Sequence, residues 1–135
     1  MPETAWIGMQ FAHAGIATDD AAGLAAKYTA LFDRPIVHEE TIDGMAVVVL
    51  GLDGADLELL EPRDGGPIAT YLDRKGPGIH HVAFATPDIG AALERAREQS
   101  IELVDDQPRP GARGHDVAFL HPDSTGGVLV EFVER

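Results

Sequence analysis

Two histidines and two glutamates occupy matched places in this sequence, and their side chains suit metal chemistry. His13 begins the stretch His-Ala-Gly-Ile-Ala-Thr, and His81 begins His-Val-Ala-Phe-Ala-Thr. Glu58, in Asp-Leu-Glu-Leu-Leu, follows the first histidine at nearly the spacing at which Glu131, in Leu-Val-Glu-Phe-Val, follows the second. Imidazole nitrogens and carboxylate oxygens together bind many divalent metals. The repeat therefore predicts one metal site made by His13, Glu58, His81 and Glu131.

The sequence around the first pair predicts a β-α-β-β-β module over about residues 8–62. Alternating side chains indicate strands, and an apolar stripe at helical spacing follows Asp19 or Asp20, either of which suits a helix N-cap. Asp43-Gly44 favours a tight hairpin between two of the strands. The expected elements are a strand at 8–18, a helix with Ala21, Leu24, Ala25, Tyr28, Leu31 and Phe32 facing the core, and strands at 36–41, 45–50 and 55–61.

A second module over about residues 78–135 repeats this order after a linker and short helix at 63–77. Its helix is expected to begin at Asp88, at the same distance from His81 as Asp20 is from His13. Strands are expected at 79–86, 101–104, 116–120 and 128–133. The predicted fold class is α+β, with two tandem β-α-β-β-β modules forming a curved mixed sheet around the metal site.

The surroundings of the four side chains support a shared site. Both histidines alternate with glycine or alanine along their strands, which leaves room above the sheet for a ligand. Glu58 and Glu131 lie on strands made otherwise of apolar residues, where an unpartnered carboxylate would be costly to bury. A single strand histidine is more often structural, and a single strand glutamate more often faces solvent. Four such residues at matched positions of a repeat favour the metal site.

Composition excludes several classes of function. The 135 residues carry 10 Lys+Arg against 23 Asp+Glu, a net charge of −13, which argues against binding to nucleic acid or to an anionic membrane surface. There is no cysteine, so any metal must use nitrogen and oxygen ligands; Co, Ni, Zn, Mn and Fe all suit them. The N-terminal residues lack the basic region and apolar core of a signal peptide, which predicts a cytoplasmic protein.

Nearly the whole chain resembles the vicinal oxygen chelate superfamily, which includes glyoxalase I, and within it the methylmalonyl-CoA epimerase family. The most specific segments are Gly-Ile-His-His at 78–81 and Ser-Thr-Gly-Gly-Val-Leu-Val-Glu at 124–131. The resemblance implies a single vicinal oxygen chelate domain over 1–135 and places the family's metal ligands on His13, Glu58, His81 and Glu131. It favours cobalt as the divalent ion and a homodimer as the assembly.

The activity that the resemblance implies is metal-dependent epimerisation of (2R)- and (2S)-methylmalonyl-CoA, an isomerase reaction of propionate metabolism. A proton would leave the carbon α to the thioester, and the metal would stabilise the resulting enolate, because a carboxylate alone is too weak a base. The family implicates the residue at Glu131 as an acid/base as well as a ligand. The expected partner is a small acyl-CoA, with no nucleic acid and no membrane.

Two departures from the family qualify this expectation. Some relatives carry a glutamate within the strand that follows the hairpin, and residues 45–49 here contain no carboxylate. The second acid/base therefore stays unassigned, and Glu39 and Glu40 are expected to face solvent. The loop Gly-Ala-Arg-Gly-His at 111–115 replaces a common Gly-Ala-His-Gly-Lys, so Arg113, with His115, is expected to receive the substrate carboxylate or the thioester end.

Basic residues that could meet the coenzyme A phosphates are not distinguished by sequence; they are Arg63, Arg74, Lys75 and Arg109.

Two other functions also stay open. A glyoxalase I-type lyase acting on a glutathione adduct would use the same four ligands. A metal-free small-molecule-binding protein of the same fold typically loses those ligands, and this chain retains them.

The acidic, lysine-poor composition, typical of proteins from salt-accumulating cells, generates a testable prediction. We expect the melting temperature to rise between low salt and molar KCl, because counterions screen the self-repulsion of a chain with net charge −13. Thermal unfolding followed by circular dichroism at both salt concentrations measures this. An unchanged melting temperature would contradict the prediction.

Overall fold

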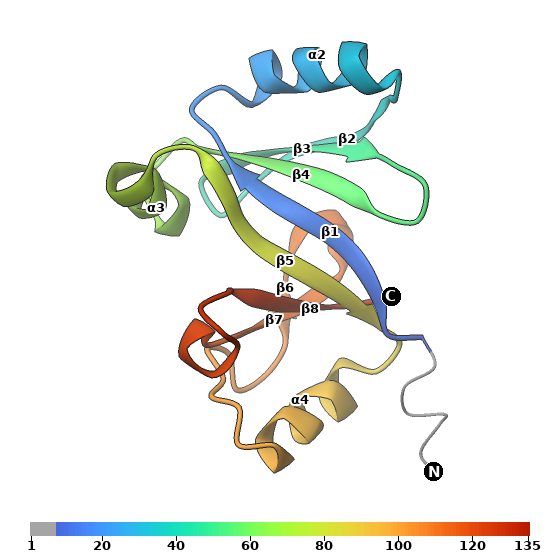
Figure 1. The fold of residues 1–135 in the computed structure, drawn as a ribbon, viewed down its shortest axis with the longest axis vertical. Coiled ribbons are helices and arrows are strands. Elements are labelled where there is room, and N and C mark those ends of the chain that lie inside the picture. The colour runs from blue at the N-terminus through green and yellow to red at the C-terminus, as the bar shows by residue number, and fades with distance from the viewer. Residues whose placement is uncertain (1–7) are drawn as a thin grey trace. The chain divides into compact units, whose positions relative to one another are not determined.

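The computed structural model describes residues 8–135, and these divide into two compact units (Figure 1). One unit comprises residues 13–80, and the other comprises residues 8–12 together with 81–135. The interpretation of the N-terminus as lacking a targeting signal falls largely on residues outside the described part. Among the described residues, no helix is long and apolar enough to cross a membrane.

The unit of residues 13–80 carries a four-stranded mixed sheet in the order β2-β3-β4-β1. Strands β2, β3 and β4 are antiparallel neighbours, whereas β4 and β1 run parallel. Asp43 and Gly44, which join β2 to β3, both have positive φ angles (52° and 73°), so the predicted hairpin is confirmed. The elements are β1 (Gln10–Ala17), α2 (Ala21–Phe32), β2 (Ile36–Ile42), β3 (Met45–Gly51), β4 (Asp56–Pro62) and α3 (Pro67–Lys75).

Helix α2 covers one face of this sheet. Ala21 and Ala25 pack against the side chains of Val48, Leu50 and Leu59, and the sheet's central strand β3 is buried along almost its whole length, as its apolar sequence predicts. The predicted core stripe of the helix is too long, however, because the side chains that join this core stop at Tyr28. Leu31, one turn later, is 73% exposed.

The other unit repeats the arrangement with the strand order β5-β8-β7-β6. Its helix α4 buries Ile89, Leu93 and Ala96 against Ala118 and Leu120. The elements are β5 (Gly78–Thr86), α4 (Ile89–Glu98), β6 (Arg109–Pro110), β7 (Asp116–Leu120) and β8 (Val130–Glu134), with short 3-10 turns at Ala112–Gly114 and Pro122–Ser124.

The strand predicted at 101–104 is wrong, since this segment contributes only an isolated bridge between Leu103 and Leu120. The ladder stops because the side chain of Asp105 accepts the backbone N–H of Phe119 at 2.8 Å, a donor that a continuing strand would use. The outer strand of the sheet is instead β6, which pairs with the beginning of β7.

The internal repeat extends to the contacts that hold each helix against its sheet. Asp20 and Asp88 both act as N-caps, as predicted, by accepting a backbone N–H of the first helical turn. In addition, Glu61 on β4 accepts the first N–H of α2 and Glu134 on β8 accepts that of α4, both at 2.9 Å. The two modules therefore share a tertiary contact that joins helix to sheet, in addition to their order of elements.

Candidate metal centre

The first candidate half-site lies where β1 and β4 run side by side. Gly15 of β1 is the register partner of Glu58, so His13 and Glu58 lie on the same face of the sheet. His13 Nδ1 lies 3.3 Å from Glu58 Oε2, and both residues are buried, with 4% and 8% exposure. Because position 15 is a glycine, no side chain stands between the carboxylate and the imidazole.

The second candidate half-site repeats this arrangement on β5 and β8. Ala83 is the register partner of Glu131, and His81 Nε2 lies 3.2 Å from Glu131 Oε1. Both residues are buried, at 5% and 7% exposure. The rings of His81 and Phe119 also meet edge to face, with centroids 5.5 Å apart, a contact that limits rotation of the imidazole.

Each module thus brings one imidazole nitrogen and one carboxylate oxygen together on a buried face. These atoms are the donors that borderline divalent cations prefer, and they project from strands rather than from loops. Burying a carboxylate on an apolar strand requires a compensating positive charge or hydrogen-bond donors. The donor set of each half-site therefore fits a divalent metal.

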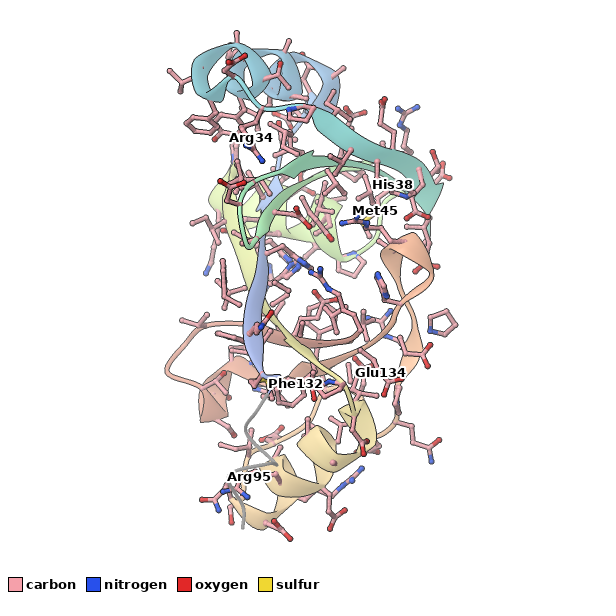
Figure 2. All side chains as sticks on the ribbon, turned by 90° about the vertical axis from the view of Figure 1, so that its right-hand side faces the viewer. Arg34, His38, Met45, Arg95, Phe132 and Glu134 are labelled. Carbon is pink, nitrogen blue, oxygen red and sulfur yellow. The ribbon has the colours of Figure 1, made fainter. Side chains whose placement is uncertain are left out.

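Strand β2 adds two polar side chains to the face that carries Glu58. His38 is the register partner of Val49, which is in turn the partner of Glu58, so all three side chains share one face. His38 is labelled in Figure 2, and its Nε2 lies 3.0 Å from Oε1 of Glu40. Glu39 is exposed as expected, but Glu40 is half-buried beside His38.

A comparison with protein families gives a match to the model of the Glyoxalase/Bleomycin resistance protein/Dioxygenase superfamily over residues 12–119. The chain belongs to this superfamily. Its α+β fold class, with two β-α-β-β-β modules that each carry a mixed sheet, is thereby confirmed as the glyoxalase fold.

Within the superfamily, the chain is similar to proteins named methylmalonyl-CoA epimerase or ethylmalonyl-CoA/methylmalonyl-CoA epimerase. It is 35% identical over 124 residues to the ethylmalonyl-CoA/methylmalonyl-CoA epimerase of Cereibacter sphaeroides, covering 88% of this chain and 92% of that one. The structure of methylmalonyl-CoA epimerase from Mycobacterium tuberculosis matches with a TM-score of 0.88 and 35% identity, over 93% and 87% of the two chains. A Streptomyces coelicolor methylmalonyl-CoA epimerase in complex with 2-nitronate-propionyl-CoA matches with a TM-score of 0.86 and 33% identity, over 93% and 96%.

The loop predicted to receive substrate has a defined shape in this superfamily member. Gly111 N–H donates to the carbonyl of His115 at 2.9 Å, and a Cβ at Gly111 would lie 2.7 Å from a Val117 methyl group, so any larger residue would require Val117 to move. Arg113 sits at the turn with φ 63° and ψ 18°, a left-handed conformation that costs an arginine about 1 kcal/mol or more. Arg113 and His115 are both half-buried.

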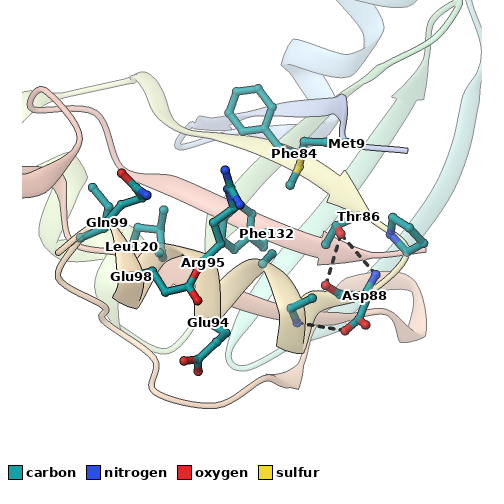
Figure 3. A pocket seen from close by; sticks show the side chains of 15 residues that line it. Met9, Phe84, Thr86, Asp88, Glu94, Arg95, Glu98, Gln99, Leu120 and Phe132 are labelled. Atoms are coloured by element: carbon teal, nitrogen blue, oxygen red, sulfur yellow. Dashed lines mark hydrogen bonds between the residues drawn. The ribbon is translucent and has the colours of Figure 1, made fainter. Parts of the chain in front are cut away.

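A groove of about 640 Å³ lies between α4 and the sheet of the unit formed by residues 8–12 and 81–135 (Figure 3). Phe84 and Phe132 line it, and each alternates along its strand with a candidate ligand, His81 or Glu131. The groove therefore opens on the opposite face of the sheet from the candidate metal ligands.

Two other histidines, His80 and His121, have local partners. His80 packs its ring against Tyr71, with centroids 5.2 Å apart, and His121 accepts the backbone N–H of Asp123. Sequence reasoning missed His38 and Phe119 as neighbours of the candidate ligands. The alternation of β2 and β7 carried the signal, but it needed the register of each strand with its neighbour to be read.

Proposed function

We propose that this chain is a metal-dependent epimerase that interconverts (2R)- and (2S)-methylmalonyl-CoA. The observation that carries the proposal is the buried imidazole–carboxylate pair at the same place in both modules. The similarity to methylmalonyl-CoA epimerases over about nine tenths of the chain supports the choice of substrate. A metal-free binding protein of the same fold typically loses these residues, and this chain retains all four.

In this proposal, His13, Glu58, His81 and Glu131 hold one divalent cation within a single domain of residues 1–135. When bound, such a cation supplies positive charge to the thioester oxygen as the neighbouring carbon loses its proton. The donor set suits Co, Ni, Zn, Mn or Fe, and the resemblance to the epimerase family favours cobalt.

Glu131 is the proposed acid/base on one side of the substrate carbon. Its Oε1 lies beside His81 Nε2, so we assign the proton transfer to its other oxygen, Oε2. Val130 and Phe132, the apolar neighbours of Glu131 on β8, exclude water from its carboxylate. A carboxylate that has lost its water binds the proton of the substrate's α carbon more strongly. Epimerisation also requires a group on the opposite side, which returns a proton to the carbon with inverted configuration.

Glu40 is the proposed second acid/base. It lies on the same face of its sheet as Glu58, and His38 holds its carboxylate at 3.0 Å. One carboxylate takes the proton from the α carbon while the other carboxylic acid gives its proton to the opposite face. The next turnover runs in the reverse direction or after proton exchange with water, so no oxidant, reductant or co-reactant is consumed.

The remaining expectations complete the proposal. Arg113, with His115, receives the substrate carboxylate or the thioester end from the 111–115 loop. The partner is a small acyl-CoA, the assembly is a homodimer, and the enzyme serves propionate metabolism in the cytoplasm. The alternative within the superfamily is a glyoxalase I-type lyase, which would share all four metal ligands and differ in substrate.

Proton exchange tests the proposed function directly. In deuterium oxide, the metal-loaded protein should introduce deuterium at the α carbon of methylmalonyl-CoA and interconvert its two epimers. A chelator should abolish both activities, and added divalent metal should restore them. Turnover of the methylglyoxal–glutathione adduct without exchange into methylmalonyl-CoA would show a lyase instead.

Substitution of Glu40 tests the second acid/base. Glu40→Gln should lower the epimerisation rate by about 10²- to 10⁴-fold, because one of the two proton carriers is lost. It should leave deuterium exchange into one of the two epimers largely intact, since Glu131 still removes that proton. Glu39→Gln is the matched control, because this exposed neighbour points to the other face of the same strand. A Glu40→Gln enzyme that epimerises methylmalonyl-CoA at the wild-type rate would refute the assignment of Glu40 as the second acid/base.

A further inference from the structure

Arg109 projects from the outer strand of its unit onto the face that carries Glu131. It is the register partner of Val117, which is the partner of Val133, and Val133 shares a face of β8 with Glu131. Phe119, the partner of Glu131 on β7, lies on this face as well. The sheet of this unit therefore presents a guanidinium group on the same side as its candidate metal ligands.

Two contacts fix the guanidinium there, and a third holds its two partners together. Its Nε lies 3.2 Å from Oδ1 of Asp105, and its Cζ lies 5.5 Å from the centroid of the Phe119 ring. The other oxygen of Asp105 accepts the N–H of Phe119. The centroid of the His81 ring lies 5.5 Å from that of the same Phe119 ring, so Phe119 contacts both the guanidinium and a proposed metal ligand.

The guanidinium remains equipped to bind an anion. Within residues 8–135, the hydrogen bonds of Arg109 use only Nε, and its side chain is 46% exposed. The two terminal amino groups form a planar fork that matches the two oxygens of a carboxylate. Asp105 holds this fork in one orientation, which reduces the entropy that binding would otherwise cost.

We propose that Arg109, rather than Arg113, binds the free carboxylate of the acyl group and so selects acyl-CoA substrates that carry a second acid, which leaves the thioester end to Arg113 with His115. This proposal deepens the proposed function and rests on it. Arg109 and the proposed ligand His81 both contact Phe119, and this closeness favours the acyl carboxylate as the bound group. The coenzyme A phosphates of a substrate held at the metal would lie farther away by the length of the pantetheine arm. Sequence alone does not distinguish Arg109 from the other basic residues; its position beside Phe119 does.

The first module carries a different group at the corresponding position. Glu40 on β2 is the register partner of Val47, as Arg109 on β6 is the partner of Val117. Each valine in turn is paired with the residue two positions beyond the glutamate ligand, Leu60 in one module and Val133 in the other. The same outer-strand position therefore carries a carboxylate, Glu40, in the first module and a guanidinium cation, Arg109, in the second.

The experiment compares ligands that differ by one carboxylate. Binding of malonyl-CoA and acetyl-CoA to the metal-loaded protein is measured by calorimetry for the wild type, Arg109→Gln and Arg109→Lys. Arg97→Gln is the matched control, because Arg97 also contacts an acid on its own chain segment, Glu94 at 3.3 Å, and its side chain has a similar exposure of 43%. Malonyl-pantetheine, which lacks the nucleotide phosphates, serves as a third ligand.

Arg109→Gln should weaken malonyl-CoA and malonyl-pantetheine binding about 10- to 100-fold and leave acetyl-CoA binding unchanged. Arg109→Lys, which keeps the charge without the fork, should recover part of the loss, and Arg97→Gln should lose nothing. An equal loss for malonyl-CoA and acetyl-CoA, or a loss that disappears with malonyl-pantetheine, would overturn the proposal, the second result in favour of a phosphate contact.

Thermal unfolding of each variant separates lost binding from lost folding, and Arg109→Lys decides the question if Arg109→Gln does not fold. The outcome is also separable from that of the proposed function. If the wild-type protein epimerises methylmalonyl-CoA and Arg109→Gln binds all three ligands normally, only the proposed role of Arg109 is refuted. Wild-type protein that prefers malonyl-CoA to acetyl-CoA but shows no exchange would remove only the epimerase.

Discussion

The burial of a carboxylate on an apolar strand is the constraint on which the rest of this structure depends. Glu58 and Glu131 are 8% and 7% exposed, and a buried carboxylate without a partner would be strongly destabilising. In each module an imidazole on the neighbouring parallel strand lies within 3.3 Å, and the position facing the carboxylate is glycine or alanine. Such pairs cost free energy when they serve folding alone, and their donor atoms suit a divalent cation.

Duplication explains how one small fold offers several kinds of chemistry. Equivalent positions keep the same residue type at the proposed metal ligands, as at His13 and His81. The residue types differ on the outer strands β2 and β6, where Glu40 and Arg109 face the same side as the proposed ligands of their own module. The first is suited to carry a proton and the second to bind an anion. On a chain with net charge −13, a guanidinium fixed by Asp105 and Phe119 is a local exception to the acidic surface.

Alternation and spacing in the sequence predict the two modules, the helix caps at Asp20 and Asp88, and the inward faces of the four candidate ligands. They fail where a local contact decides the structure. The 101–104 segment has the apolar residues of a strand, but the side chain of Asp105 occupies the N–H that the strand would need. Glu40 reads as a solvent-facing residue because strand order and register, which no single segment encodes, determine what lies on its face. In the sheet order, β2 is separated from β4 by β3, and β6 is separated from β8 by β7.

The most direct test of the account is a metal titration of the wild-type chain and of two variants, His13→Ala and His81→Ala, one from each module. Cobalt absorption and equilibrium dialysis report ligand geometry and stoichiometry without any substrate. The account predicts one ion per chain, and each variant should weaken its binding by roughly 100-fold or more, since loss of a direct ligand should exceed the 10- to 100-fold cost of losing a supporting residue. Two ions per chain, or full affinity after loss of either histidine, would contradict it.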